Sequence, residues 1–109
     1  MLKYSESHAE RTNAMNNSIR TETVDLMMEA VLTLKNKEEC YRFFEDLCTV
    51  GELLSISQRL AVADMLIGKK TYLEIAEKTG ASTATISRVN RALRYGEGGF
   101  ELALGRIKR

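Results

Sequence analysis

The segment EIAEKTGASTATISR, residues 74–88, constrains the fold more than any other, because two helical patterns meet there at one glycine. TYLEIAEK, residues 71–78, has the apolar spacing of a helix of about two turns. Gly80 can adopt the positive φ that a sharp turn requires, and Ser82 is placed to cap the next helix, TATISRVNRALRY, residues 83–95. The side chains predicted to face inward are Leu73, Ile75 and Ala76 on the first helix and Ile86, Val89 and Leu93 on the second.

The spacing around Gly80 is typical of a helix-turn-helix. Ala76 lies four residues before the glycine. Ile86 and Val89 lie six and nine residues after it. A small side chain lets two helices cross closely, and the apolar pair packs the second helix against the first. In such an arrangement the first helix braces the second, which enters the major groove of DNA. The sequence therefore predicts a helix-turn-helix at about 71–95.

The outer face of the second helix carries short hydroxyl side chains followed by arginines. Hydroxyl groups approach base edges or phosphates without steric obstruction, directly or through water, and a helix N-terminus favours a phosphate. Arginines pair with phosphates or reach guanine. The residues predicted to contact DNA are Lys69, Lys70, Tyr72, Ser82, Thr83, Thr85, Ser87, Asn90, Arg91 and Arg94.

Charge is distributed unevenly along the chain, although the net charge is only +1. Residues 1–67 carry seven basic and eleven acidic side chains, a balance of −4. Residues 68–96 carry six basic and two acidic side chains, a balance of +4, and residues 97–109 contribute +1. A basic segment of this kind attracts phosphates. The charge pattern therefore supports double-stranded DNA as the partner.

The remainder of the chain also has helical spacing. Apolar residues recur at three- and four-residue steps over 19–34, 35–49, 50–70 and 98–107, and Gly51 is interpreted as a break between the second and third of these helices. The absence of proline and the small number of glycines favour an all-α chain. We expect a flexible tail at 1–17 and a single helical domain at 18–109. The apolar arc on the third helix is broad enough for several neighbours, and small domains often complete their cores by dimerising.

Several other classes of protein are not expected. No apolar run is long enough to span a membrane, and the first residues do not resemble a signal peptide, so a cytoplasmic location is expected. Cys40 and Cys48 are eight residues apart on one predicted helix, roughly 12 Å, which is too far for a disulfide, so reduced core thiols are expected. His8 lies in a polar tail, and no nucleophile–base pair, metal-ligand spacing or phosphate-binding glycine loop is present. We therefore expect no enzymatic activity and no metal, and no cofactor is assigned.

Residues 47–93, LCTVGELLSISQRLAVADMLIGKKTYLEIAEKTGASTATISRVNRAL, resemble the core of the Trp repressor family. EECYRFFEDLCT and LRYGEGGFELAL resemble its YerC/YecD-type branch. The resemblance extends over about 20–107 and is most specific at 79–95. It implies an all-α intertwined homodimer, a Trp repressor-like helical bundle whose two helix-turn-helix units enter successive major grooves roughly 34–36 Å apart.

The resemblance also implies a site for a small-molecule effector. The family's ligand-binding threonine and two arginines match Thr49, Arg59 and Arg88. A glycine beside the bound indole is replaced by Val89, and a serine near the ligand's amino group is replaced by Ala92. These departures disfavour tryptophan and favour a different effector or none. As alternatives, Arg59 pairs with Glu52, Asp64 or a partner's acidic residue, and Arg88 contacts a phosphate. Leu73 also stands where the family has a DNA-contacting arginine.

Two functions remain in view. The first is a sequence-specific, homodimeric DNA-binding transcriptional regulator acting as a repressor. The alternative is a helical dimeric module that binds another protein and not DNA. An RNA-binding role is weaker, because few aromatic side chains are available to stack on bases.

Overall fold

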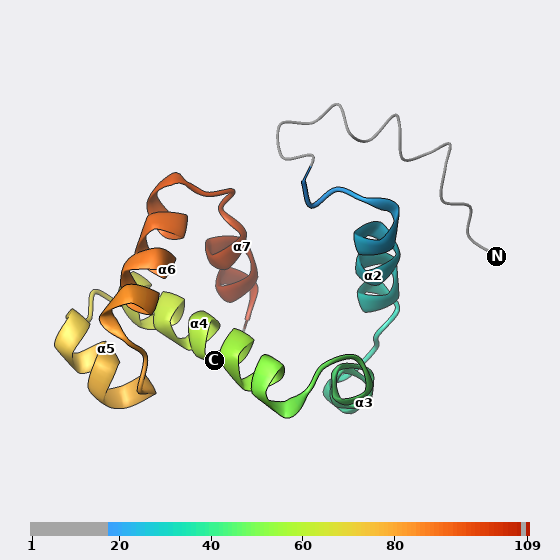
Figure 1. Ribbon diagram of the computed structural model, residues 1–109, viewed down its shortest axis with the longest axis horizontal. Coiled ribbons are helices and arrows are strands. Elements are labelled where there is room, and N and C mark those ends of the chain that lie inside the picture. Colours follow the sequence, from blue (N-terminus) through green and yellow to red (C-terminus); the bar gives the residue numbers. More distant parts are fainter. Residues whose placement is uncertain (1–17, 108) are drawn as a thin grey trace. The chain divides into compact units, whose positions relative to one another are not determined.

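The computed structural model describes residues 18–107 and 109, and these residues form helices with no strand among them. The predicted tail at 1–17 lies outside the described residues. The described residues form six helices, which Figure 1 labels α2 to α7. They are α2 (Glu22–Leu32), α3 (Lys37–Leu47), α4 (Val50–Ile67), α5 (Tyr72–Thr79), α6 (Thr83–Tyr95) and α7 (Gly99–Arg106). The all-α prediction is confirmed. The helices fall into two compact units, with α2 and α3 in one and α4 to α7 in the other, Cys48–Arg109.

Threonine side chains fix where α4 and α5 begin. Thr49 accepts a hydrogen bond from the backbone N–H of Glu52, and the Glu52 carboxylate accepts one from the backbone N–H of Thr49. Thr71 and Glu74 make the same reciprocal pair at the start of α5. Each pair satisfies two N–H groups that a helix end leaves without partners. The interpretation of Gly51 as a break was wrong, because the cap at Thr49 places that glycine inside the first turn of α4.

The end of α4 is an abrupt turn made by a lysine. The backbone N–H of Lys69 donates to the carbonyl of Leu66, and that of Lys70 donates to the carbonyl of Met65. This is the Schellman pattern, in which the residue after the cap is left-handed and usually glycine. Here that residue is Lys69, with φ of 65°, while Gly68 at the cap has φ of −76°. The predicted stop after α4 is present, with the lysine and not the glycine in the left-handed conformation.

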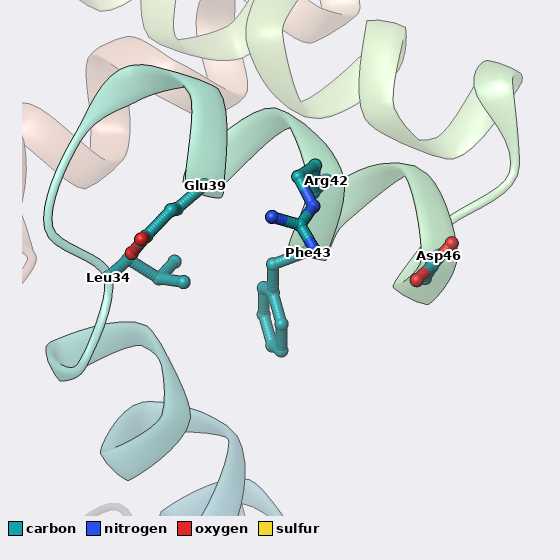
Figure 2. Close-up of a pocket in the computed structure, with 5 residues that line it drawn as sticks. All are labelled: Leu34, Glu39, Arg42, Phe43 and Asp46. Atoms are coloured by element: carbon teal, nitrogen blue, oxygen red, sulfur yellow. The ribbon is translucent and has the colours of Figure 1, made fainter.

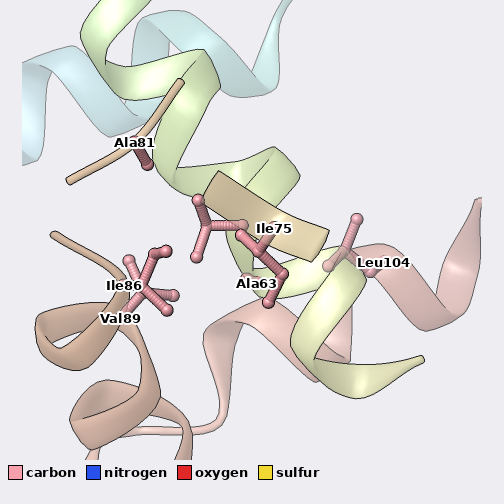
Figure 3. Close-up of a cluster of buried hydrophobic side chains, with 7 residues drawn as sticks. Ala63, Ile75, Ala81, Ile86, Val89 and Leu104 are labelled. Carbon is pink, nitrogen blue, oxygen red and sulfur yellow. The ribbon is translucent and has the colours of Figure 1, made fainter. Parts of the chain in front are cut away.

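Seven apolar side chains form the core of the Cys48–Arg109 unit (Figure 3). Helix α4 contacts α5, α6 and α7, and α5 also contacts α6. Full burial of an isoleucine stabilises a fold by about 1.5–3 kcal/mol, so the two buried isoleucines are major contributors to the packing of α5 and α6. The core residues are Val62, Ala63, Ile75, Ala81, Ile86, Val89 and Leu104.

This packing corrects the predicted position of Leu73 and shows which side chains of α7 are covered. Leu73 is 70% exposed, because it lies about 200° around the helix from the buried Ile75. On α7, Leu104 is buried and Phe100 is half-buried, whereas Ala103 and Ile107 are exposed. The prediction that Leu73 faces inward was therefore wrong, and α7 covers the core with a narrower stripe than its sequence indicates.

The apolar side chains of α2, α3 and the first half of α4 are poorly covered. Neither α2 nor α3 contains a buried residue. In the first half of α4, Val50, Leu54 and Ile56 are 75%, 62% and 54% exposed. Cys40 and Cys48 are free thiols and only half-buried, so neither is a core residue of this chain. The apolar patterns expected from the sequence are present, but none of the apolar side chains of α2, α3 or the first half of α4 is fully buried in this chain.

Candidate nucleic-acid interface

The turn between α5 and α6 is built on Gly80. Its φ is 74°, and its backbone N–H donates to the carbonyl of Ala76 at 2.9 Å. The Thr79 hydroxyl accepts from the backbone N–H of Ala81 at 3.1 Å. Gln58 on α4 donates from its side-chain amide to the carbonyl of Thr79 at 3.1 Å. The predicted left-handed glycine is confirmed, and the turn is anchored to α4 by a side-chain hydrogen bond that no sequence pattern indicates.

Ser82 caps α6, as the sequence predicts. Its hydroxyl accepts from the backbone N–H of Thr85 at 3.1 Å and lies 3.1 Å from the Thr85 hydroxyl. Thr85 is half-buried and Ser82 is exposed. The first turn of α6 contains no acidic residue, in contrast to α4 and α5, which each have a glutamate there. The positive end of the α6 dipole is therefore not neutralised from within its own first turn, which favours an anion such as a phosphate.

One face of α6 is buried and the other carries polar and basic groups. Ile86 and Val89 are 0% and 3% exposed, and Leu93 is half-buried, which confirms the predicted inner edge. The exposed side chains lie further around the helix, from about 60° away from Ile86 for Thr83 to about 140–160° away from the three inner residues for Arg91. They are Thr83, Ser87, Arg88, Arg91 and Arg94. The face therefore combines hydroxyl groups near the N-terminus with arginines in the second and later turns.

Two of the predicted DNA-binding residues contact each other. The side-chain amide of Asn90 on α6 donates to the hydroxyl of Tyr72 in the first turn of α5 at 3.1 Å. Asn90 is half-buried and Tyr72 is 36% exposed. Because the tyrosine hydroxyl accepts this bond, its own proton is available to a phosphate oxygen. The contact also holds the first turn of α5 beside α6.

Lys69 and Lys70 are both exposed and directly precede the cap of α5. Lys69 is the only described non-glycine residue with positive φ. A left-handed lysine costs roughly 1–2 kcal/mol relative to an ordinary backbone conformation. Strain of this kind concentrates at functional sites, which makes Lys69 a stronger candidate than the sequence alone indicates.

The residues that the family resemblance assigns to an effector are distributed over two helices. Thr49 caps α4, Arg59 lies on α4 and Arg88 lies on α6, and all three are exposed. Val89, which replaces the family's glycine, is 3% exposed and part of the core. Ala92, which replaces the serine, is exposed. The bulk of Val89 is therefore committed to packing α6 onto the rest of the unit.

Asp64, one of the alternative partners of Arg59, is instead paired with Arg109. Both Asp64 oxygens accept from the guanidinium group at 2.7 Å. The Arg109 hydrogen bonds lower the pKa of Asp64 and raise that of Arg109. Glu52, the other alternative within the chain, caps α4, and its pKa is lowered chiefly by the backbone N–H of Thr49.

A separate pocket of about 380 Å³ lies in the unit of α2 and α3. Figure 2 shows the Arg42 guanidinium and the Phe43 ring together on α3, with the Glu39 carboxylate near Leu34 and Asp46 further along the helix. The Glu39 carboxylate accepts from the backbone N–H of Lys35 at 3.0 Å. The pocket contains none of the residues predicted for DNA or effector. Among the described residues, no three His, Cys, Asp or Glu side chains are grouped to hold a metal ion.

The geometry of α5, the left-handed turn and α6 defines a helix-turn-helix protein. The chain belongs to the Trp repressor protein family, whose model matches residues 22–108. This is a family of regulators rather than enzymes. No described helix is long and apolar enough to cross a membrane.

Individual relatives are similar over most of the chain. The uncharacterized protein YerC of Bacillus subtilis (strain 168) is 53% identical over 90 residues, which cover 83% of this chain and 86% of YerC. The crystal structure of a TrpR like protein from Eubacterium eligens ATCC 27750 superposes with a TM-score of 0.79 at 54% identity, covering 86% of this chain and all of that one. A structure from Staphylococcus aureus, given as a candidate Trp repressor, has a TM-score of 0.80 at 48% identity, covering 85% of this chain and 93% of that one.

Proposed function

We propose that this protein is a sequence-specific DNA-binding transcriptional regulator that acts as a repressor and places α6 in the major groove. The observation that carries the proposal is the solvent-facing side of α6, which presents exposed hydroxyl groups and arginines while Ile86 and Val89 are buried. The capped and uncompensated N-terminus of α6 and the +4 balance of residues 68–96 add attraction for phosphate.

The individual contacts follow from chemistry. Lys69, Lys70 and the Tyr72 hydroxyl are placed before or within the first turn of α5, where they suit backbone phosphates. Thr83 and Ser87 are short and exposed, so they suit base edges approached directly or through water. Ser82 and Thr85 act mainly through the cap they form, and Asn90 acts together with Tyr72. The remaining contacts are assigned to Arg91 and Arg94.

We propose that the functional species is a homodimer. The absence of any buried residue in α2 and α3, together with the exposed apolar side chains of α4, supports a second copy as the missing cover. Two-fold symmetry would present two copies of α6 to half-sites roughly 34–36 Å apart. Sedimentation equilibrium should give twice the chain mass, and Leu54→Glu, which adds charge at a 62% exposed apolar position, should shift the equilibrium toward the monomer. A monomeric wild-type protein at micromolar concentration would contradict this proposal.

DNA binding is tested by fluorescence anisotropy with duplexes enriched from a random-sequence pool. The double variant Arg91→Ala/Arg94→Ala should lose at least about thirtyfold in affinity, because each arginine contact contributes on the order of 1–3 kcal/mol. Arg106→Ala, which removes an exposed arginine from α7, is the matched control and should retain wild-type affinity. Failure to enrich any duplex, with an intact dimer, would favour the alternative of a protein-interaction module.

The effector is a separate part of the proposal. Thr49, Arg59 and Arg88 are the candidate ligand residues, and we propose that tryptophan does not regulate this protein. The core position of Val89 and the missing hydroxyl at Ala92 support this view. Affinity for the selected duplex should be unchanged by added tryptophan. The titration is then repeated with each of the other amino acids. A change in DNA affinity would identify a different effector, and no change with any of them would mean that no amino acid is the effector.

A further inference from the structure

Leu73 is exposed in a position that packing does not explain. It is 70% exposed, the largest fraction of any large aliphatic side chain between residues 71 and 95. It lies in the first turn of α5, turned away from the buried Ile75. A leucine left largely in water contributes little to the stability of the fold. Its role therefore has to be sought outside the core of this unit.

The surroundings of Leu73 are those of the candidate DNA interface. Lys69 and Lys70 are exposed immediately before the cap of α5. The adjacent Tyr72 is held to Asn90 of α6 by the 3.1 Å hydrogen bond. Asn90 lies three residues after Ser87 and four before Arg94, so these side chains are neighbours on the helix surface. The Tyr72–Asn90 contact thus brings the first turn of α5 alongside the polar face of α6.

We propose that Leu73 contacts the C5 methyl group of a thymine in each half-site and thereby selects for thymine at that position. The inference rests on the proposed DNA binding. The edges of the bases in the major groove present acceptors and donors, and the only apolar group among them is the thymine methyl. Leucine has neither a donor nor an acceptor. Against any other edge it would remove water from a polar group without replacing the hydrogen bond, which is unfavourable.

The experiment removes the methyl group and the leucine separately. A duplex that binds the wild-type protein is selected from a random-sequence pool, and its thymines are replaced by deoxyuracil one position at a time. This replacement deletes only the methyl group and leaves the pattern of donors and acceptors intact. Affinities are measured for the wild-type protein, Leu73→Ala and Leu102→Ala. Leu102 is a 55% exposed leucine on α7 and serves as the matched control.

We expect one thymine per half-site at which deoxyuracil weakens wild-type binding about fourfold, the equivalent of burying one methyl group. Replacement in both half-sites should weaken it about fifteenfold. In Leu73→Ala the same replacements should have less than about a twofold effect, whereas Leu102→Ala should retain the wild-type sensitivity. The loss of the methyl effect in Leu73→Ala means that the two changes are coupled, and this non-additivity identifies the contact independently of any general fall in affinity.

The other outcomes have distinct meanings. If a duplex is bound tightly but Leu73→Ala keeps the full sensitivity to every deoxyuracil, the thymine contact is refuted while DNA binding stands. If Leu73→Ala weakens the dimer in sedimentation and leaves the deoxyuracil effects unchanged, Leu73 packs against protein and the inference is also refuted. If no duplex is enriched, the proposed function and this inference fail together.

Discussion

Replacing Gly80 with alanine tests the left-handed turn between α5 and α6 without a steric complication. The φ of Gly80 is 74°, and a Cβ built there meets no atom within 4 Å. The cost is therefore conformational, roughly 1–2 kcal/mol for an L-residue in this region. Alanine also lowers the conformational entropy of the unfolded chain, which raises the free energy of unfolding by about 0.5–1 kcal/mol and offsets part of this cost. We expect a net loss of about 1 kcal/mol in the free energy of unfolding.

Gly105→Ala is the control that cancels the unfolded-state contribution. Gly105 lies in α7 with no positive φ, and a Cβ there also meets nothing within 4 Å. Alanine should stabilise α7 by about 0.5–1 kcal/mol. The two variants should then differ by about 1–2 kcal/mol, which measures the left-handed conformation itself. Gly80→Asn should fall between them, because asparagine tolerates this region better than alanine.

The assay is urea denaturation followed by circular dichroism at one fixed protein concentration, since an associating protein has a concentration-dependent stability. Equal shifts for Gly80→Ala and Gly105→Ala would refute the reasoning, because they would mean that the turn imposes no conformational cost. A loss of stability in Gly105→Ala would instead show that α7 has additional contacts at that position.

Three further predictions concern other chain turns and one cap. Gly96→Ala should destabilise the protein by about 1–3 kcal/mol in a thermal melt, because the new Cβ would clash with the carbonyl oxygen of Ala92. A variant as stable as the wild type would show that the backbone of this turn shifts without cost. Lys69→Gly should raise the free energy of unfolding by about 0.5–1 kcal/mol in urea, because glycine adopts the φ of 65° without strain. The same variant should reduce the slope of log affinity against log salt by about 0.9 for each phosphate that the lysine neutralises. An unchanged salt slope would show that Lys69 does not contact a phosphate. The pKa of Glu74 is lowered chiefly by the backbone N–H of Thr71, so the stability from this cap is present above the ordinary value of 4.5 and is lost as pH falls through the folded value. Glu74→Gln, which keeps the cap without titrating, should show a shallower acid loss of helicity than the wild type, and identical pH curves would contradict the assignment.

The helix-turn-helix could be predicted closely because its determinants are local. The left-handed Gly80, the Ser82 cap and the inner edge at Ile86 and Val89 all follow from rules that act within one or two turns. The start of α4 was also within reach, since a threonine followed three residues later by glutamate, Thr49 and Glu52, is a capping-box pattern. The prediction placed the break at Gly51 because it relied on the glycine and not on the Thr49–Glu52 capping pattern.

Other features depend on contacts between distant residues. The hydrogen bonds from Gln58 to Thr79 and from Asn90 to Tyr72 join positions 21 and 18 residues apart, so no local pattern encodes them. The exposure of Leu73 could have been predicted from the sequence. Its position on the helix, about 200° from Ile75, already indicates that both cannot face the same core. For the predicted DNA-binding residues, the sequence identified the exposed hydroxyl groups, the arginines and the Ser82 cap, but not the contact of the Thr85 hydroxyl with Ser82.

Helix α4 has a consequence for which changes the protein can accept. It runs without interruption for 18 residues, about 27 Å, with open apolar side chains along its first half and the buried Val62 and Ala63 in its second. Inserting or deleting one residue between the halves would rotate one against the other by about 100°. Val62 and Ala63 could then stay in register with α5 and α6 only if the earlier apolar side chains turned away from their present direction. Divergent versions of this protein should therefore accept substitutions at the exposed polar positions of α4 far more readily than any change in its length.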